Sequence, residues 1–272
     1  MHEETRTREQ LRHHYEVEKE LADRLRRSTR TERTALFKTL YNELFARVPD
    51  HPRLVRRETA ETTRRATAAR MALLKPFLGG VDTFLEIAPG DCRLAYEVCR
   101  SVRQVIGVDI SDQSGLDANR PANFRLAVYD GYHLDLPKES IDLAFSYQFL
   151  EHLHPEDVAD HLRLVQGLLK PGGLYVISTP HRFSGPHDVS AHFTPEPTAF
   201  HLKEWTYGEL VREMRAAGFR QVHTYRLGRP RRCAVWNAAT LAAESILGRF
   251  PRGLRKRLSA RLFQHVTVVA AN

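Results

Sequence analysis

The spacing of hydrophobic residues divides the chain into two parts of different character. Residues 1–78 place apolar residues at helical spacing in three stretches: LRHHYEVEKELADRLRR, RTERTALFKTLYNELFARV and one that ends in ARMALLKPFL. Pro49 and Pro52 separate the second stretch from the third. We therefore expect these residues to form an all-helical N-terminal extension or lid.

From residue 79 to residue 228, short apolar runs alternate with helical segments. The runs VDTFLEIA, RQVIGVDI, FRLAVYD, IDLAFSY and GLYVIST predict buried strands. Two helices in this part have clear ends: Pro155 begins one, and Thr206 with Glu209 forms a capping box for another, which Gly218 ends. This alternation is typical of a mostly parallel sheet with helices on both faces, so the sequence predicts an α/β, Rossmann-like core.

Residues 229–262 interrupt the strand pattern near the end of the chain. The run QVHTYRL before them and the run FQHVTVVAA, which makes up nearly all of the final segment 263–272, predict a hairpin-like pair with an antiparallel last strand. The insertion between them contains two helical patterns, AVWNAATLAAESIL and RGLRKRLSARL, separated by Pro251. Helices of this kind usually pack on their own domain. The alternatives are that they roof a ligand pocket, bind a partner or lie against a membrane surface.

Polar residues follow the first three predicted strands. Glu86 lies near the end of the first run, Gly90 permits a tight turn after it, and Asp109 and Asp130 end the next two runs. Each residue alone has a simpler explanation, since an acid at a strand end is commonly a helix cap and Asp-Gly is a common turn. Ligands of open α/β sheets bind beyond the carboxyl ends of the strands, so the ordered series predicts one ligand crevice.

A nicotinamide dinucleotide is a poor match for this crevice. Its motif, G-x-G-x-x-G, lets the backbone approach a pyrophosphate and lets helix pack on strand. The corresponding positions here are Ala88, Gly90 and Arg93, and Arg93 is too large for that close packing. A P-loop is excluded because G-x-x-x-x-G-K-[ST] is missing. The sequence therefore favours a cofactor without phosphates.

The segment 81–222, about half of the chain, resembles the class I S-adenosylmethionine-dependent methyltransferases. FLEIAPGDC is similar to their E-x-G-x-G-x-G signature, with Ala88 and Cys92 at two glycine positions. The segments VIGVDIS, IDLAFSYQFLEHL, LLKPGGLYVISTP and AGF match in the family's order, most closely as in quinone-pathway enzymes and sugar O-methyltransferases. The resemblance implies that the chain is a methyltransferase and that its cofactor is S-adenosyl-L-methionine.

The resemblance also implies a role for each cofactor residue. Glu86 and the backbone near Ala88 and Gly90 would hold the methionine part, and Asp109 the ribose hydroxyls. Ile110 would pack on the adenine, and Asp130 would accept from its amino group, with neighbours beside it. The complete expected set is Glu86, Ala88, Gly90, Asp109, Ile110, Asp130, Gly131, Tyr132 and Tyr147.

The segment SYQFLEHLHPED after the fourth strand holds the candidate catalytic residue. Methyl transfer is an in-line displacement, so the protein aligns the acceptor and, for a hydroxyl, removes its proton. His152 is the expected general base, because an unperturbed histidine has a pKa of about 6.5. The alternative is that Glu151 and His152 only brace this loop or contact the cofactor.

Two classes of acceptor are disfavoured. Enzymes that methylate amino groups of bases or glutamine resemble one another in an Asn/Asp-Pro-Pro-aromatic tetrad, where this chain has Ser146, Tyr147 and Gln148. Methylation of a pyrimidine carbon needs a nucleophilic cysteine near the acceptor, whereas Cys92 and Cys99 belong to the turn and helix after the first strand.

The fifth strand is followed by the long segment TPHRFSGPHDVSAHFTPEPTAFHLKEW, which is unusual for a simple connection and indicates a functional loop. Its histidines and carboxylates would suit zinc or manganese, but their spacing matches no recognised metal motif. We therefore predict a polar acceptor pocket and no metal. The expected acceptor-binding residues are Gln148, His181, Arg182, His187 and His201.

Composition adds limits on partners and location. The 41 Lys and Arg against 33 Asp and Glu give a net charge of +8, which favours polyanions, but solvated faces of the Arg-rich helices and of RPRRC explain the charge equally well. The three cysteines support neither a disulfide framework nor a zinc knot. No run of apolar residues is long enough for a membrane span, so we expect a cytoplasmic protein.

The sequence thus predicts an S-adenosylmethionine-dependent methyltransferase that acts on a hydroxyl of a polar small molecule or glycan, with nucleic acid as an unlikely partner. Three alternatives remain open. They are a quinone-type C-methyltransferase with a more apolar pocket, an RNA-binding or RNA-modifying protein that uses the basic termini, and a non-catalytic cofactor-binding protein that regulates another enzyme.

Overall fold

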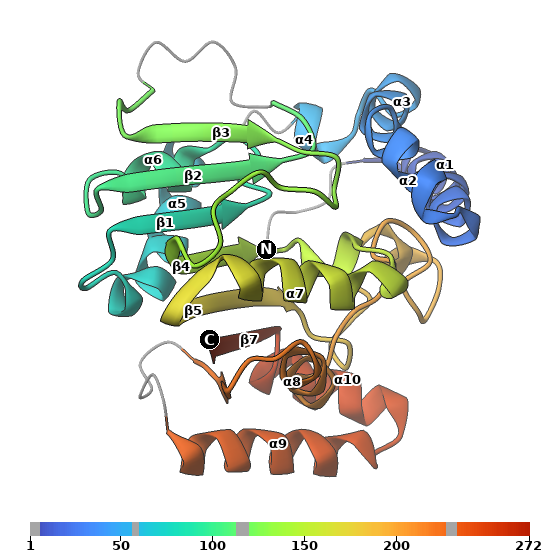
Figure 1. Cartoon of the computed structure of the whole chain (residues 1–272). Helices are drawn as coiled ribbons and strands as arrows, with labels where there is room; N and C mark the ends of the chain where they lie inside the picture. Colours follow the sequence, from blue (N-terminus) through green and yellow to red (C-terminus); the bar gives the residue numbers. More distant parts are fainter. Residues whose placement is uncertain (1–5, 56–59, 113–119, 227–232) are drawn as a thin grey trace.

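A seven-stranded sheet forms the centre of the computed structural model, which describes residues 6–55, 60–112, 120–226 and 233–272 (Figure 1). The strand order is β3-β2-β1-β4-β5-β7-β6. Strands β1 to β5 are parallel to one another, and β7 runs antiparallel to both β5 and β6. This confirms the α/β, Rossmann-like fold with an antiparallel last strand. The strands are β1 Thr83–Ile87, β2 Gln104–Asp109, β3 Phe124–Val128, β4 Ile141–Tyr147, β5 Leu169–Pro180, β6 Gln221–Thr224 and β7 His265–Ala271.

The order of the strands fixes where a ligand can bind. The chain passes from β1 outward to β2 and β3, and then returns to place β4 on the other side of β1. The carboxyl ends of β1 and β4 therefore flank a switch point, where the loops separate and leave a crevice. The sequence segments with candidate chemistry lie at or after the carboxyl ends of β1, β2, β3, β4 and β5.

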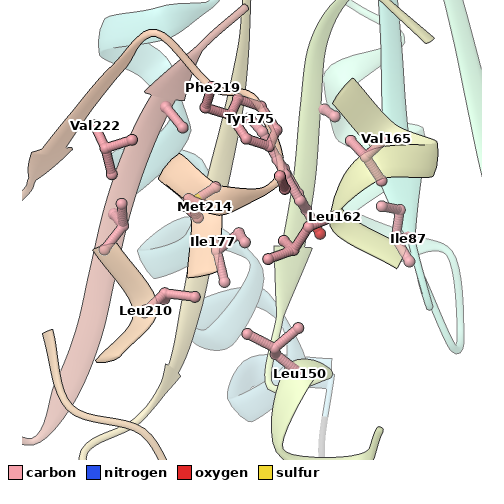
Figure 2. Packing of buried hydrophobic residues seen from close by; sticks show 14 of the residues in the cluster. Ile87, Leu150, Leu162, Val165, Tyr175, Ile177, Leu210, Met214, Phe219 and Val222 are labelled. Carbon is pink, nitrogen blue, oxygen red and sulfur yellow. The ribbon is translucent and has the colours of Figure 1, made fainter. Parts of the chain in front are cut away.

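Helices cover both faces of the sheet, and successive strand residues alternate between two cores. On one face, α5 (Ala60–Leu74), η1 (Lys75–Phe77) and α6 (Arg93–Val98) pack against Phe84 and Val176. On the other face lie α7 (Val158–Leu168) and α8 (Tyr207–Ala216). Figure 2 shows this second core, in which Leu162 and Val165 of α7 and Leu210 and Met214 of α8 surround the strands.

The N-terminal extension contains more helices than the sequence predicts. Besides α5 and η1, given above, these helices are α1 Arg8–Arg27, α2 Arg30–Phe37, α3 Leu40–Arg47 and α4 Pro52–Val55. The expected single helix RTERTALFKTLYNELFARV is wrong, because it breaks at Lys38 and Thr39. The break lets α2 face the sheet domain while Leu40 and Leu44 of α3 pack against Leu21 of α1, which one straight helix cannot do.

The insertion forms the two expected helices, α9 (Ala234–Gly248) and α10 (Arg252–Leu262). Residues 229–232, which hold most of the basic RPRRC motif, lie outside the described residues. Helix α9 contacts α8 and β6, and α10 contacts α9. The buried Glu244 of α9 accepts hydrogen bonds from the backbone N–H of Tyr207 and Gly208 at the start of α8, which fixes the insertion to the domain. Among the described residues, no helix has the length and apolarity required to cross a bilayer.

Candidate active site

A cavity of about 750 Å³ opens at the carboxyl ends of β1, β2 and β4 and is closed on one side by the N-terminal helices. Its volume falls in the range of small-molecule and cofactor sites. The sheet side contributes Ala88, Gly90, Asp109, Ile110 and Gln148, among others, whereas the helical side contributes apolar and aromatic residues. The N-terminal helices contribute Leu25, Phe37, Leu40 and Tyr41, and the loops after β4 and β5 add Phe149, Leu153 and Phe200.

The turn after β1 has an unusual backbone. Ala88, Gly90 and Cys92 all have left-handed dihedral angles, with φ of 54°, 56° and 59°. The N–H of Gly90 donates to the Asp109 carboxylate at 3.3 Å, and the N–H of Ala88 donates to the carbonyl oxygen of Val108 at 2.7 Å. Beside Gly90 a Cβ would meet no atom within 4 Å, so the turn faces open space in the cavity.

We expect Ala88→Gly to stabilise the protein. A non-glycine residue in the left-handed region costs about 1–2 kcal/mol, part of which is offset by the greater freedom of glycine in the unfolded chain. The net gain should be about 0.5–1 kcal/mol in the free energy of unfolding, measured by urea denaturation. Cys92→Gly is the matched control, because the Cys92 side chain is fully buried and its loss leaves a cavity that offsets the backbone gain. A decrease in stability for Ala88→Gly would contradict the strain at this turn.

Glu86 lies behind this turn and does not line the cavity. It is almost fully buried at the end of β1, its Oε2 atom has no hydrogen-bond partner among the described residues, and burial raises its pKa to about 8. An unsatisfied buried carboxyl is costly, and such sites mark functional positions. The contact of Glu86 with the methionine part of a cofactor stays a prediction.

Asp109 and Ile110 lie at the end of β2 and line the cavity. The Asp109 carboxylate is buried and accepts from the backbone N–H of Ile110 at 2.7 Å and from that of Gly90. It is thereby held in one orientation beside the turn. These groups fit S-adenosylmethionine. Asp109 offers a carboxylate that can accept from the ribose hydroxyls, the open turn leaves room for the methionine chain, and Ile110 offers an apolar surface for the adenine.

The Asp130 carboxylate is bound within its own turn, and its contact with the adenine stays a prediction. It accepts from the backbone N–H of Tyr132 at 2.8 Å and of His133 at 2.7 Å, and its second oxygen pairs with the His133 ring at 2.7 Å. Despite some desolvation, these hydrogen bonds lower the pKa of Asp130 to about 2. Gly131 and Tyr132 line the cavity, whereas Asp130 does not, so the side chain acts as a turn cap in this structure.

Tyr132 connects the N-terminal helices to the site, a link that sequence patterns did not reveal. Its hydroxyl donates to Asp157 at 2.9 Å and accepts from Arg33 at 3.2 Å. Arg33 of α2 is 1% exposed and pairs with Asp157 at 2.8 Å. In the sequence, the only local sign of this link is Arg33 itself. Sequence alone does not distinguish a buried arginine from a solvated one.

Tyr147 and Gln148 follow β4 and also line the cavity. The guanidinium of Arg70 lies 4.9 Å from the centre of the Tyr147 ring. Gln148 has a left-handed backbone, with φ of 52°, and its N–H donates to Ser178 on β5 at 2.8 Å. A strained residue held by a neighbouring strand is typical of positions that aim a side chain into a site.

His152 lies in the cavity wall, in a short 3₁₀ helix η2 (Leu150–His152). Its Nδ1 bonds to the carbonyl oxygen of Phe200 at 3.0 Å, which assigns the proton to Nδ1 and the lone pair to Nε2. Its ring lies 5.1 Å from that of His201. His152 and His201 are therefore neighbours, of which only His152 lines the cavity, and their roles as base and acceptor ligand stay predictions.

His181, Arg182 and His187 do not line this cavity. His181 is fully buried and pairs with Glu244 of the insertion at 2.7 Å. Arg182 pairs with Glu209 at 2.8 Å and lines a separate cavity of about 260 Å³, while His187 bonds to Ser184 within its own loop. These three residues therefore lie away from the cavity in which they were predicted to contact the acceptor, because the long loop folds toward α8 and the insertion.

The cysteines near the site are unreactive. Burial, together with nearby carboxylates, raises the pKa of Cys92 to about 12, and burial raises that of Cys99 to about 11. The thiolate is the nucleophilic form, so neither residue supplies one at neutral pH. This agrees with the expectation that a cysteine-dependent carbon methylation is disfavoured.

Comparison with known proteins gives the same picture as the geometry. Residues 85–177 match the model of a family described as a methyltransferase domain. A probable S-adenosylmethionine-dependent methyltransferase of Mycolicibacterium smegmatis is 30% identical over 137 residues, which are 50% of this chain and 51% of that protein. The match therefore spans about half the length of this curated relative.

Solved structures share the fold over most of the chain at low identity. The 1,6-didemethyltoxoflavin-N1-methyltransferase of Burkholderia thailandensis superposes with a TM-score of 0.59 at 20% identity, over 90% of this chain and 91% of that one. A SAM-dependent methyltransferase of Archaeoglobus fulgidus superposes with a TM-score of 0.54 at 20% identity, over 77% and 94% of the two chains. These likenesses establish the fold. The family match shows that residues 85–177 carry a methyltransferase domain. The turn after β1, Asp109 and Ile110 lie at the switch point, where its cofactor, S-adenosylmethionine, would bind.

Proposed function

We propose that this protein transfers a methyl group from S-adenosylmethionine to a hydroxyl oxygen of a small molecule with an aromatic or otherwise apolar framework. The observation that carries the proposal is the position of His152 in the wall of a cavity whose other side is built from the N-terminal helices. S-adenosylmethionine supplies an electrophilic methyl group. The remaining task of the protein is to hold the acceptor in line and to assist the loss of its proton.

The lining of the cavity supports an apolar acceptor over a glycan. Phe37, Tyr41 and Phe200 approach from the helical side and the following loop, and Phe149 and Leu153 from the loop after β4. Aromatic and aliphatic walls bind flat apolar rings through burial and stacking, whereas a sugar requires many polar partners. The polar residues expected to bind a glycan, His181, Arg182 and His187, lie elsewhere.

His152 is suited to act on a hydroxyl in this cavity. The hydrogen bond of its Nδ1 to Phe200 holds the ring in place and assigns the lone pair to Nε2. The loop is further fixed because the backbone carbonyl of Glu151 accepts from Leu202 and Lys203. A base that is already oriented loses little freedom when the acceptor binds.

The test begins with calorimetric titration of S-adenosylhomocysteine, with NAD as the control ligand. We expect one-to-one binding of S-adenosylhomocysteine and no binding of NAD. Labelled S-adenosylmethionine is then supplied with a panel of phenols, aliphatic alcohols and sugars, and the product is located by NMR. Labelling of phenolic oxygens supports the proposal, and labelling of sugars alone contradicts the acceptor class.

We expect His152→Ala to lower the turnover of the best acceptor by about 100-fold or more and to leave the affinity for S-adenosylhomocysteine unchanged. The matched control is His192→Ala, because His192 is exposed and does not line the cavity. Full activity of His152→Ala would show that the residue is structural.

A quinone-type C-methyltransferase is the second candidate, because the same apolar walls suit a quinol ring. The two differ in the product: a methyl carbon bound to oxygen resonates far from one bound to a ring carbon. An NMR spectrum of the product therefore decides between them.

A further inference from the structure

Three ligand-type side chains meet beside the cavity, and one of them, His152, lies in its wall. Glu151 and His152 come from η2 after β4, and His201 comes from the loop that precedes α8. Each offers one nitrogen or oxygen atom, and these atoms all lie within 4.8 Å of one another. Two imidazoles and one carboxylate form a ligand set that metalloenzymes use for divalent transition metals.

Each of the three side chains is oriented by a further hydrogen bond. The Nδ1 atom of His152 bonds to the carbonyl oxygen of Phe200, and that of His201 bonds to the buried Glu204 carboxylate at 2.9 Å. Glu151 Oε2 accepts from the Thr179 hydroxyl at 2.8 Å. Metal-binding histidines usually have such a partner on the second ring nitrogen, because it fixes the tautomer and the ring direction. The cluster has this arrangement on both histidines.

The second oxygen of Glu151 gives independent support. Glu151 is fully buried, and its Oε1 atom has no hydrogen-bond partner among the described residues. Leaving a buried carboxylate oxygen unpaired is unfavourable, and a bound cation would provide the missing interaction. Glu204 Oε2, in the residue that orients His201, is likewise buried without a hydrogen-bond partner in the described structure. The cluster and its neighbour Glu204 therefore hold two buried carboxylate oxygens that accept no hydrogen bond in the described structure.

We propose that Glu151, His152 and His201 bind one divalent transition-metal ion, and that this ion contacts the hydroxyl oxygen of the methyl acceptor. The metal site itself stands on the cluster geometry, whereas the contact with the acceptor rests on the proposed function. Three protein ligands leave coordination positions open, as in catalytic zinc sites. Because His152 lines the cavity, an open position is accessible to a ligand there.

The ligand set selects among ions. Two imidazole nitrogens favour zinc or manganese over magnesium, which prefers oxygen ligands and retains several waters. Zinc is expected to bind more tightly than manganese, in the usual order of divalent affinities. Magnesium is expected to bind weakest.

The ion changes how the acceptor loses its proton. With its lone pair on the metal, His152 acts as a ligand, and the metal lowers the pKa of the bound hydroxyl so that its proton passes to solvent water. The oxygen then forms a bond to the methyl carbon as the carbon–sulfur bond breaks, and the sulfonium becomes a neutral thioether. The metal keeps its oxidation state.

A second cluster of the same type, His14, Glu18 and His51, is a weaker candidate. The Arg6 guanidinium donates to His14 Nδ1 at 2.8 Å, while Nε2 bonds to Glu18 at 2.8 Å, so both nitrogens of this ring already have protein partners. A guanidinium also disfavours a nearby cation. This cluster provides a control for the experiment.

The test uses the full chain, stripped with a chelator and dialysed, and titrated with Zn²⁺, Mn²⁺ and Mg²⁺ separately by calorimetry. We expect one site, with zinc the tightest and magnesium the weakest. Addition of Co²⁺ should give visible absorption bands typical of a site with nitrogen and oxygen ligands, and this readout needs no activity. Failure of all three titrated ions and of Co²⁺ to bind the wild-type protein would overturn the proposal.

Variants locate the site. Glu151→Gln and His201→Ala should lower zinc affinity by at least tenfold, and Glu204→Gln should lower it 10- to 100-fold through the orientation of His201. Glu18→Gln, in the second cluster, and His192→Ala should leave it unchanged. If Glu18→Gln removes binding and Glu151→Gln does not, the assignment is wrong. If the Glu151 variant fails to fold, the Co²⁺ spectra of wild type and of Glu204→Gln still decide.

Activity separates this inference from the proposed function. If methylation of phenols is lost with the chelator and restored by zinc or manganese, both stand. If the stripped protein methylates phenols at the full rate, the ion is not needed, the inference fails, and His152 is left as the base. If S-adenosylhomocysteine does not bind while zinc does, the proposed function fails and the metal site stands.

Discussion

Replacement of Arg33 with alanine is expected to lower the free energy of unfolding by about 3–5 kcal/mol, because it leaves a buried carboxylate without its partner. Arg33 is 1% exposed and Asp157 is 6% exposed. The two side chains meet in a bidentate pair, with nitrogen–oxygen distances of 2.8 and 3.0 Å. Arg33 also donates to the hydroxyl of Tyr132, which itself donates to Asp157, so one substitution disrupts the whole network.

The loss should affect the site as well as the stability. Helix α2 carries Arg33 and, four residues later, Phe37, whose ring contacts the cavity. Without the ion pair we expect the N-terminal helices to detach, which would be seen as faster limited proteolysis before residue 78 and weaker binding of the acceptor. Urea denaturation gives the change in stability.

Arg163→Ala is the matched control for this prediction. Arg163 pairs with Asp160 at 2.9 Å, but the two side chains are 58% and 42% exposed, and such surface pairs contribute about 0–1 kcal/mol. If Arg33→Ala lowers the free energy of unfolding no more than Arg163→Ala does, the network of Arg33, Tyr132 and Asp157 is not a principal anchor of the N-terminal helices.

Asp109→Ala is expected to weaken the binding of S-adenosylhomocysteine by about 100-fold and to leave the fold intact. A carboxylate that accepts two ribose hydroxyls provides two charge-assisted hydrogen bonds of about 1.5–3 kcal/mol each, and 1.4 kcal/mol corresponds to a factor of ten in affinity. The Asp109 carboxylate is buried in the cavity wall and already held by the N–H groups of Gly90 and Ile110. Calorimetry measures the affinity, and circular dichroism confirms the fold.

Asp130→Ala tests whether Asp130 contacts the adenine, as the sequence predicts, or only caps its own turn. The Asp130 carboxylate is bound by Tyr132 and His133 in its own turn and does not line the cavity, so this variant should weaken the cofactor by less than tenfold. Equal losses for the two variants would restore the predicted adenine contact of Asp130. No loss for Asp109→Ala would remove its assignment to the ribose.

The sequence predicted the sheet well because burial of strands is a local pattern. Each predicted apolar run from VDTFLEIA to GLYVIST contains or lies within a strand of the structure, and the capping box at Thr206 and Glu209 is present. Of the polar strand-end series, Gly90 and Asp109 line one cavity, whereas Glu86 and Asp130 do not, because parallel strands bring the chain to one edge without fixing where each side chain points. The break at Lys38 and Thr39 was missed, since it depends on which partners α2 and α3 find.

The candidate site was predicted in part. Asp109, Ile110, Gln148 and His152 line the cavity, as expected from their place after β2 and β4. The direction of the long loop after β5 was not predictable, because the buried pair of His181 with Glu244 joins residues 63 positions apart. The wall of the cavity is therefore more apolar than the histidine-rich loop suggested.

The sequence by itself determined the class of fold and the crevice at the strand ends, because hydrophobic period and strand-end residues act over short distances along the chain. The kind of cofactor came from the resemblance of its motifs to a known family. Only the tertiary structure decided which side chains meet across long separations. Arg33 reaches Asp157 across 124 positions, and His201 joins Glu151 and His152 from a separate loop. Such contacts depend on how whole elements pack. The sequence alone does not show whether a charged residue or a histidine is solvated or buried beside a partner.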